Sequence, residues 1–138
     1  MRVFLDTNVL VSAFTTRGLC ADVVRVVLAD HELVVGEVVL QQLRKVLRSK
    51  IGFPPRLVAN IEALLREHEV VARPHSPADF PARDTSDRYV LASALEGKAD
   101  VLVTGDRDLL DLEIDPPLIV LDPRGFWSLV SRRAPHPR

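Results

Sequence analysis

Apolar and polar positions follow two different spacings along the chain, and their alternation predicts strands separated by helices. Short runs of consecutive apolar residues are typical of buried strands. Such runs occupy residues 3–5, 33–35, 70–71, 101–103 and 118–121. Apolar residues at every third or fourth position predict helices over 8–14, 19–29, 38–48, 55–68, 87–96, 109–112 and 124–132. Strands that alternate with helices imply a parallel sheet with helices on both faces, so the predicted fold class is α/β in one domain.

Some of the apolar residues could pack either in the core or in a dimer interface. In the predicted helix over 55–68, four residues are expected to face inward or to form a dimer face. They are Leu57, Ile61, Leu64 and Leu65. Phe126 and Trp127, in the last helix, are expected to pack in the core or in a dimer interface rather than to stack on bases.

Composition limits the class of protein and its location. The chain has 138 residues, of which 47% are hydrophobic and 27% charged, and this balance predicts one globular domain over 1–131. Cys20 has no partner for an internal disulfide and is expected to be a buried small hydrophobe. No apolar segment approaches the roughly 20 residues needed to cross a bilayer, and no signal peptide is evident, so we expect a cytoplasmic protein. Residues 132–138 are expected to form a frayed basic tail.

Acidic residues follow two of the predicted strands. Asp6-Thr7-Asn8 comes after the strand over 3–5, and Thr104-Gly105-Asp106 comes after the strand over 101–103. The carboxyl ends of parallel strands meet at one edge of a sheet, where ligands bind, so Asp6 and Asp106 become neighbours if their strands are adjacent. Asp87, in a third acidic segment over 84–87, could face the same cleft. An Asp before a helix is by itself more often a cap, so the prediction of a site depends on their convergence.

Carboxylates brought together repel, and a divalent cation usually relieves the repulsion. A set of ligands that contains only oxygen suits Mg²⁺ or Mn²⁺, and the four histidines have no spacing suited to zinc. The sequence has no glycine-rich phosphate loop, no GxSxG and no CxxC, so nucleotide-hydrolase, serine-hydrolase and redox functions have no support. The remaining pattern fits metal-assisted hydrolysis of phosphodiester bonds, in which metal-activated water attacks.

The same segments resemble a known family. The resemblance lies in three segments, which are Phe4-Leu5-Asp6-Thr7-Asn8-Val9-Leu10, Asp84-Thr85-Ser86-Asp87 and Val103-Thr104-Gly105-Asp106-Arg107-Asp108-Leu109-Leu110. The chain resembles PIN domains (the PilT N-terminus type), particularly the bacterial and archaeal toxin branch similar to VapC. The resemblance implies a Rossmann-like, three-layer α/β/α sandwich with four or five parallel strands. It also implies a Mg²⁺- or Mn²⁺-dependent ribonuclease of a type II toxin–antitoxin pair, homodimers, and a small inhibitory antitoxin protein.

The resemblance also assigns roles to residues of this chain. Three aspartates fall on acidic positions of the family and would hold the metal: Asp6, Asp87 and Asp106. Four further residues fall on supporting positions: Asn8 as a polar neighbour, Thr104 as an orienting hydroxyl, Asp84 as an acid or cap, and Asp108 as a further acid.

One position departs from the family pattern. Where the family usually has a Glu before a Leu, this chain has Gln42 before Leu43. A Gln side chain brings no charge, so metal affinity should fall and catalysis should be reduced or absent. Glu37 lies five residues away on a different face of the helix and is a poor substitute.

The cationic residues leave two alternatives open. Arg44, Lys45, Arg48 and Lys50 form either a solvated helix face or a contact for the RNA backbone beside the cleft. Arg88 and Arg107 lie beside acidic positions, where they could hold phosphate or pair with carboxylates. For the whole chain there are likewise two hypotheses. It is a metal-dependent endoribonuclease, or it is a PIN-like module that has lost catalysis and binds RNA or protein.

Overall fold

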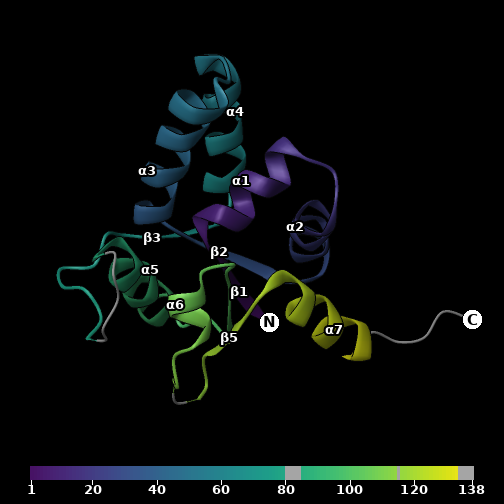
Figure 1. Ribbon diagram of the computed structural model, residues 1–138, viewed down its shortest axis with the longest axis vertical. Coiled ribbons are helices and arrows are strands. Elements are labelled where there is room, and N and C mark those ends of the chain that lie inside the picture. Colours follow the sequence, from purple (N-terminus) through teal and green to yellow (C-terminus); the bar gives the residue numbers. More distant parts are fainter. Residues whose placement is uncertain (80–84, 115, 134–138) are drawn as a thin grey trace, which may run out of the picture.

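A parallel β-sheet runs through the centre of the molecule, as the computed structural model shows (Figure 1). The structure describes residues 1–79, 85–114 and 116–133. Within these ranges the strands are β1 (Arg2–Leu5), β2 (Glu32–Gly36), β3 (Glu69–Val71), β4 (Val101–Val103) and β5 (Ile119–Leu121). All pairings are parallel, in the order β3-β2-β1-β4-β5, which confirms the α/β prediction with the larger of the two strand numbers.

Helices connect the strands and cover the sheet. Their bounds are α1 (Thr7–Thr15), α2 (Leu19–Asp30), α3 (Glu37–Val46), α4 (Pro55–Arg66), α5 (Thr85–Glu96), α6 (Arg107–Leu110) and α7 (Pro123–Arg133). In the view of Figure 1, α1, α3 and α4 lie above the strands and α5 and α6 lie to their left, whereas α7 lies at the right below α2, against which it packs. Within the described ranges, no helix combines the length and the apolar character that crossing a bilayer requires.

The two central strands are the most deeply buried part of the sheet. In β1, Val3, Phe4 and Leu5 are at most 1% exposed, and all three residues of β4 are buried as well. Strands covered on both faces read as continuous apolar runs, which explains the pattern in the sequence. Each such side chain contributes about 1.5–3 kcal/mol when it is fully buried. The residues that follow these strands are therefore attached to a rigid base.

The carboxyl ends of β1 and β4 lie side by side. The Asp6 N–H donates to the Val103 carbonyl at 2.9 Å, one residue beyond the end of β1, and the Thr104 N–H donates to the Leu121 carbonyl at 2.9 Å. In this strand order the chain proceeds to β2 and β3 on one side of β1 and to β4 and β5 on the other. The boundary between β1 and β4 is thus a topological switch point, where ligands bind in open α/β sheets.

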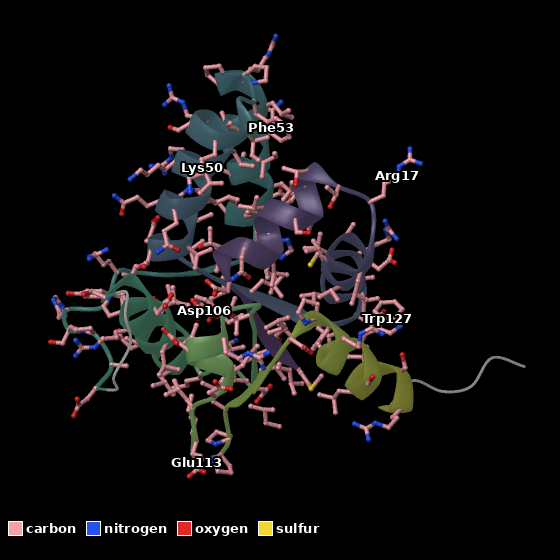
Figure 2. All side chains as sticks on the ribbon, in the orientation of Figure 1. Arg17, Lys50, Phe53, Asp106, Glu113 and Trp127 are labelled. Carbon is pink, nitrogen blue, oxygen red and sulfur yellow. The ribbon has the colours of Figure 1, made fainter. Side chains whose placement is uncertain are left out.

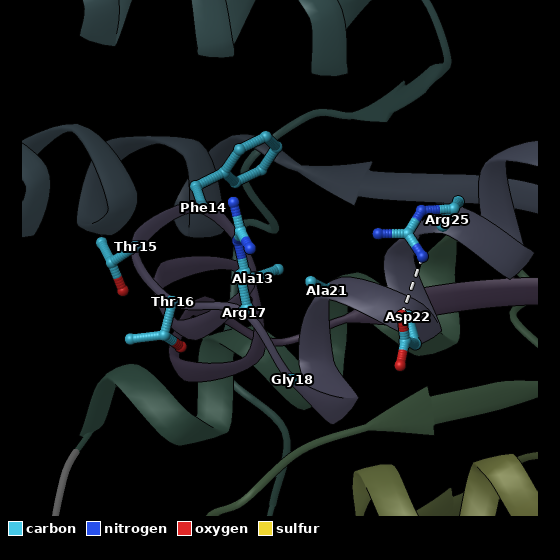
Figure 3. A pocket seen from close by; sticks show the side chains of 9 residues that line it. All are labelled: Ala13, Phe14, Thr15, Thr16, Arg17, Gly18, Ala21, Asp22 and Arg25. Carbon is cyan, nitrogen blue, oxygen red and sulfur yellow. Dashed lines mark hydrogen bonds and ion pairs between the residues drawn. The ribbon is translucent and has the colours of Figure 1, made fainter.

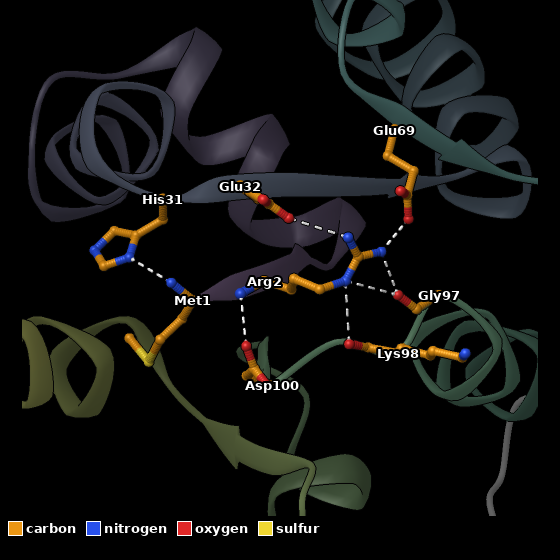
Figure 4. Close-up of polar contacts among 8 residues, drawn as sticks. All are labelled: Met1, Arg2, His31, Glu32, Glu69, Gly97, Lys98 and Asp100. Atoms are coloured by element: carbon orange, nitrogen blue, oxygen red, sulfur yellow. Dashed lines mark hydrogen bonds and ion pairs between the residues drawn. The ribbon is translucent and has the colours of Figure 1, made fainter.

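At the opposite edge of the sheet, Arg2 ties together the starts of three strands (Figure 4). Its guanidinium forms ion pairs with Glu32, the first residue of β2, and with Glu69, the first residue of β3. It also donates to the Gly97 carbonyl at 2.6 Å, and its backbone N–H donates to the Asp100 carboxylate at 2.8 Å. These contacts fix the amino ends of the strands, which helps to keep their carboxyl ends in register.

Two helices differ from the prediction. The regular α-helix predicted over 38–48 ends at Val46, and a π-helical segment, η1 (Leu47–Ile51), follows it until Gly52 at φ 82°. In α4, Leu57 and Leu64 are 40% and 39% exposed, so the inward-facing prediction was wrong for them. Val58 is buried together with Ile61 and Leu65 instead, because these residues lie at i, i+3 and i+7 and so share one face of the helix.

Three smaller points concern the predictions outside these helices. Cys20 is half-buried rather than fully buried. Phe126 is completely buried, whereas Trp127 beside it is 37% exposed. Asp84 and residues 134–138 of the predicted tail lie outside the described residues, and α7 continues to Arg133.

Candidate active site

An open pocket of about 560 Å³ lies at the carboxyl ends of β1 and β4. It is lined from α1, α3, α5 and the start of α6 by Asp6, Thr7, Asn8, Val11, Ser12, Thr15, Gln42, Val46, Ser86, Asp87 and Asp106. The structure therefore brings four residues singled out from the sequence to one place, although they come from four segments of the chain. They are Asp6, Gln42, Asp87 and Asp106.

Asp6 is held rigidly by its neighbours. It caps α1, and its Oδ1 accepts from the Thr7 N–H at 2.7 Å, while its Oδ2 accepts from the Thr104 hydroxyl at 2.7 Å. The Thr104 hydroxyl in turn accepts from the Asp106 N–H at 3.0 Å. Asp6 is 5% exposed and Thr104 is fully buried. A single buried hydroxyl thus links the two aspartates at the ends of adjacent strands.

Burial raises the pKa of the Asp6 carboxyl above its ordinary value, and the charge of Asp106 raises it further. The hydrogen bonds from Thr104 and Thr7 oppose the increase without cancelling it. An ionised Asp6 therefore occupies an unfavourable environment, which a bound cation would improve.

This pKa shift gives a prediction about stability. Because the pKa of Asp6 is higher in the folded state than in the unfolded chain (about 3.9), its contribution to stability is greatest at acidic pH. That contribution is lost as the pH rises through the folded pKa. Asp6→Asn removes the titration and keeps an acceptor for Thr7. We therefore expect the variant to gain stability relative to wild type as the pH rises from about 4 to 7.

Urea unfolding in the presence of a chelator, repeated across this pH range, measures the difference in free energy of unfolding. Asp111→Asn is a matched control, since Asp111 is exposed beyond the end of α6. The prediction would be wrong if the free energy of unfolding of Asp6→Asn, relative to that of wild type, stayed constant or decreased as the pH rose.

Within the described residues, three carboxylates lie close to one another. Asp87, Asp106 and Asp108 each offer an oxygen, and these oxygens all lie within 4.8 Å of one another. Asp87 lies in the first turn of α5, while Asp106 caps α6 by accepting from the Asp108 N–H at 2.8 Å. Asp108, which the sequence placed in a supporting role, therefore belongs to this group of three carboxylates. Asp6 is connected to the group by the Thr104 hydroxyl, which donates to Asp6 and accepts from the Asp106 N–H.

Gln42 lines the same pocket as the acidic residues. It is half-buried on α3, and its side-chain carbonyl accepts a hydrogen bond from the Thr7 hydroxyl. Glu37 forms an ion pair with Arg66, with N–O distances of 2.8 and 2.9 Å, and does not line the pocket. The position at which the resemblance implies a Glu is therefore occupied by a neutral amide in this chain.

Helix α1 supplies a polar wall that sequence reasoning largely missed. The Asn8 carbonyl oxygen accepts from the Gly105 N–H at 3.1 Å and connects α1 to the turn after β4. Ser12 and Thr15 follow it along the pocket. The spacing of four and three residues between Asn8, Ser12 and Thr15 was the available signal, since it places polar groups on one face of an otherwise apolar helix.

The cationic residues that were candidates for RNA binding differ in their contacts and exposure. Arg44 forms two hydrogen bonds with Glu62, both at 2.9 Å, and the Arg88 Nε donates to the Ala78 carbonyl at 2.9 Å. The remaining four are exposed: Lys45, Arg48, Lys50 and Arg107.

A second pocket, of about 630 Å³, lies between the end of α1 and the start of α2 (Figure 3). It is larger than the acidic pocket, but its lining contains one carboxylate, Asp22, which Arg25 already pairs at 2.8 Å. The concentration of chemically active groups therefore favours the smaller pocket as the functional site.

Fold and site together define a Rossmann-like α/β domain with a carboxylate pocket at its switch point. A profile of the family described as "PIN domain" matches residues 2–108, and the chain belongs to this family. Among solved structures, the chain is similar to one from VapBC2 of Rickettsia felis, determined bound to a DNA fragment from its promoter. The TM-score is 0.63 at 17% identity, over 87% of this chain and 97% of that one, so the two share a fold. None of the curated proteins matches the chain significantly.

Proposed function

We propose that the protein is a metal-dependent endoribonuclease that acts as the toxin of a type II toxin–antitoxin pair. Proteins of the PIN domain family are nucleases. The observation that carries the proposal is the convergence of Asp6, Asp87, Asp106 and Asp108 at the switch point between β1 and β4. An acidic pocket of this kind repels a phosphodiester unless a cation is bound in it, so the proposal includes a metal.

The donor set fits Mg²⁺ or Mn²⁺. All the candidate ligands are oxygens, which these hard cations prefer. The oxygens of Asp87, Asp106 and Asp108 all lie within 4.8 Å of one another, so one cation between them would be within reach of all three. We propose these three residues as metal holders together with Asp6, whose carboxylate is oriented by Thr104.

A bound cation would lower the pKa of water and offset the charge that develops on the phosphate oxygens. The chain's own residues position the reactants. Thr104 fixes Asp6 relative to Asp106, and Asn8 ties α1 to the turn that carries Asp106. Ser12 and Thr15 present hydroxyl groups along the wall that α1 forms, where the ribose and phosphate of the RNA strand would pass.

We further propose a small antitoxin protein and a second copy of the chain as partners. The solved neighbour is a VapBC assembly, which supports an antitoxin partner here by analogy. Three large apolar side chains are exposed on η1 and α4, namely Ile51, Leu57 and Leu64. Leu57 and Leu64 are seven residues apart and share one face of α4, which supports a protein contact on that helix.

Gln42 favours a second candidate function. A neutral residue in the pocket lowers the negative charge available to a cation, so the domain would bind RNA or protein without cleaving it. This candidate predicts a folded protein that binds RNA and shows no turnover with either metal.

Removal of the metal tests the proposed function. We expect RNA cleavage with Mg²⁺ or Mn²⁺, complete loss of cleavage in excess chelator, and recovery when the metal is restored. Asp106→Asn protein, purified in parallel, controls for contaminating nucleases. Cleavage that persists in chelator would contradict a metal-dependent mechanism, and absence of cleavage with either metal would favour the binding module.

A further inference from the structure

A basic pocket of about 390 Å³ adjoins the acidic pocket along α3 and η1. It is lined by Gln42, Lys45, Val46, Ser49, Lys50 and Ser86. Gln42, Val46 and Ser86 also line the acidic pocket, so the two openings share a wall. Figure 2 labels Lys50 and Asp106, which mark the basic and the acidic end of this surface.

We infer that the basic pocket binds the RNA backbone phosphate next to the one that is cleaved. The inference rests on the proposed nuclease function and deepens it. Lys45 and Lys50 supply the charge, and the Ser49 hydroxyl supplies a further hydrogen-bond donor. The strand passes from the acidic pocket over the shared wall into the basic one.

Helical spacing explains why two lysines five residues apart line one pocket. The lining residues of this helical stretch lie at i, i+3, i+4, i+7 and i+8, which is one face of a helix: Gln42, Lys45, Val46, Ser49 and Lys50. The segment η1 continues the helical path through Ser49 and Lys50, so both ends of the stripe reach the same pocket.

The charges on this surface are available to a ligand. Within the described part of the chain, neither Lys45 nor Lys50 forms an ion pair, and the same holds for Arg48, which lines a neighbouring hollow. Arg44, by contrast, is neutralised by Glu62. Because the whole chain has a net charge of −1, this cationic surface is a local feature rather than part of a general attraction to polyanions.

The lining of the pocket indicates which part of a nucleic acid it contacts. Ammonium and hydroxyl groups are phosphate ligands, and no aromatic residue lines the pocket on which a base could stack. Contacts of this kind give affinity without sequence specificity. A pocket of about 390 Å³ has room for a group of nucleotide size.

Binding of a fluorescent single-stranded RNA, measured by anisotropy in chelator at several salt concentrations, tests the inference without requiring cleavage. Lys45→Ala/Lys50→Ala is expected to bind about tenfold more weakly at low salt. Its slope of log K against log salt should be smaller by about 0.7, the contribution of one neutralised phosphate of a single strand. The matched control is Arg124→Ala/Arg132→Ala, which removes the same charge from exposed positions on α7.

We expect the control to bind like wild type. Equal affinity and slope for the lysine variant and wild type, at unchanged melting temperature, would overturn the inference. Lysine-dependent binding by a wild-type protein that does not cleave RNA would support the pocket while contradicting the proposed nuclease.

Discussion

Asp106→Asn is expected to lower the rate of RNA cleavage about 10³-fold while the protein remains folded. Asp106 belongs to the group with Asp87 and Asp108, and its charge also acts on Asp6. Removing it from a metal site should raise the barrier by several kcal/mol, and about 4 kcal/mol corresponds to 10³-fold. Asn keeps an acceptor for the Asp108 N–H, so the cap of α6 survives the substitution.

Initial rates at saturating Mn²⁺, together with melting temperatures, measure the effect. Asp111→Asn makes the same chemical change five residues further along, at an exposed position that does not line the pocket, and should leave the rate unchanged. A rate for Asp106→Asn within tenfold of wild type would show that this carboxylate does not take part in catalysis. Partial recovery at high metal concentration would identify weakened metal binding as the cause of the loss.

The sequence predicted the central part of the fold because burial leaves a simple pattern there. β1 and β4 are covered on both faces, so their residues form uninterrupted apolar runs, and the change to Asp6 and to Thr104 marks the points where the chain leaves the core. What the sequence could not supply was the order of the strands. The adjacency of β1 and β4 joins residues about 100 positions apart, and local patterns carry no information on such a pairing.

The features that escaped prediction depend on tertiary contacts. Arg44 is equivalent to Lys45 in sequence terms, and only the packing of α4 against α3 shows that Glu62 neutralises it. The π-helical turn of η1 likewise leaves no signature in the pattern of 38–48, because its apolar positions fit a regular helix equally well. The role of Thr7 depends on Gln42, 35 residues away, whose side chain accepts its hydrogen bond.

Gln42→Glu is expected to increase metal affinity and cleavage at limiting metal by about tenfold or more. The substitution adds a carboxylate beside Asp6, Asp87 and Asp106 at a position whose side chain already lines the pocket. The Thr7 hydroxyl can donate to Glu as it does to Gln, so the local geometry is kept. Added negative charge should strengthen binding of a divalent cation, while in chelator the same charge should lower the melting temperature through repulsion.

Initial rates across a Mn²⁺ titration separate the apparent metal affinity from the maximal rate. Asn60→Asp is the matched control, since it converts an exposed amide on α4 to an acid outside the pocket and should change neither quantity. If Gln42→Glu leaves the metal dependence unchanged, the Gln42 side chain lies outside the reach of the cation, and the neutral residue no longer explains a weakened site. If wild type is inactive and Gln42→Glu cleaves RNA, the natural chain is a binding module whose remaining carboxylates retain the arrangement of a nuclease.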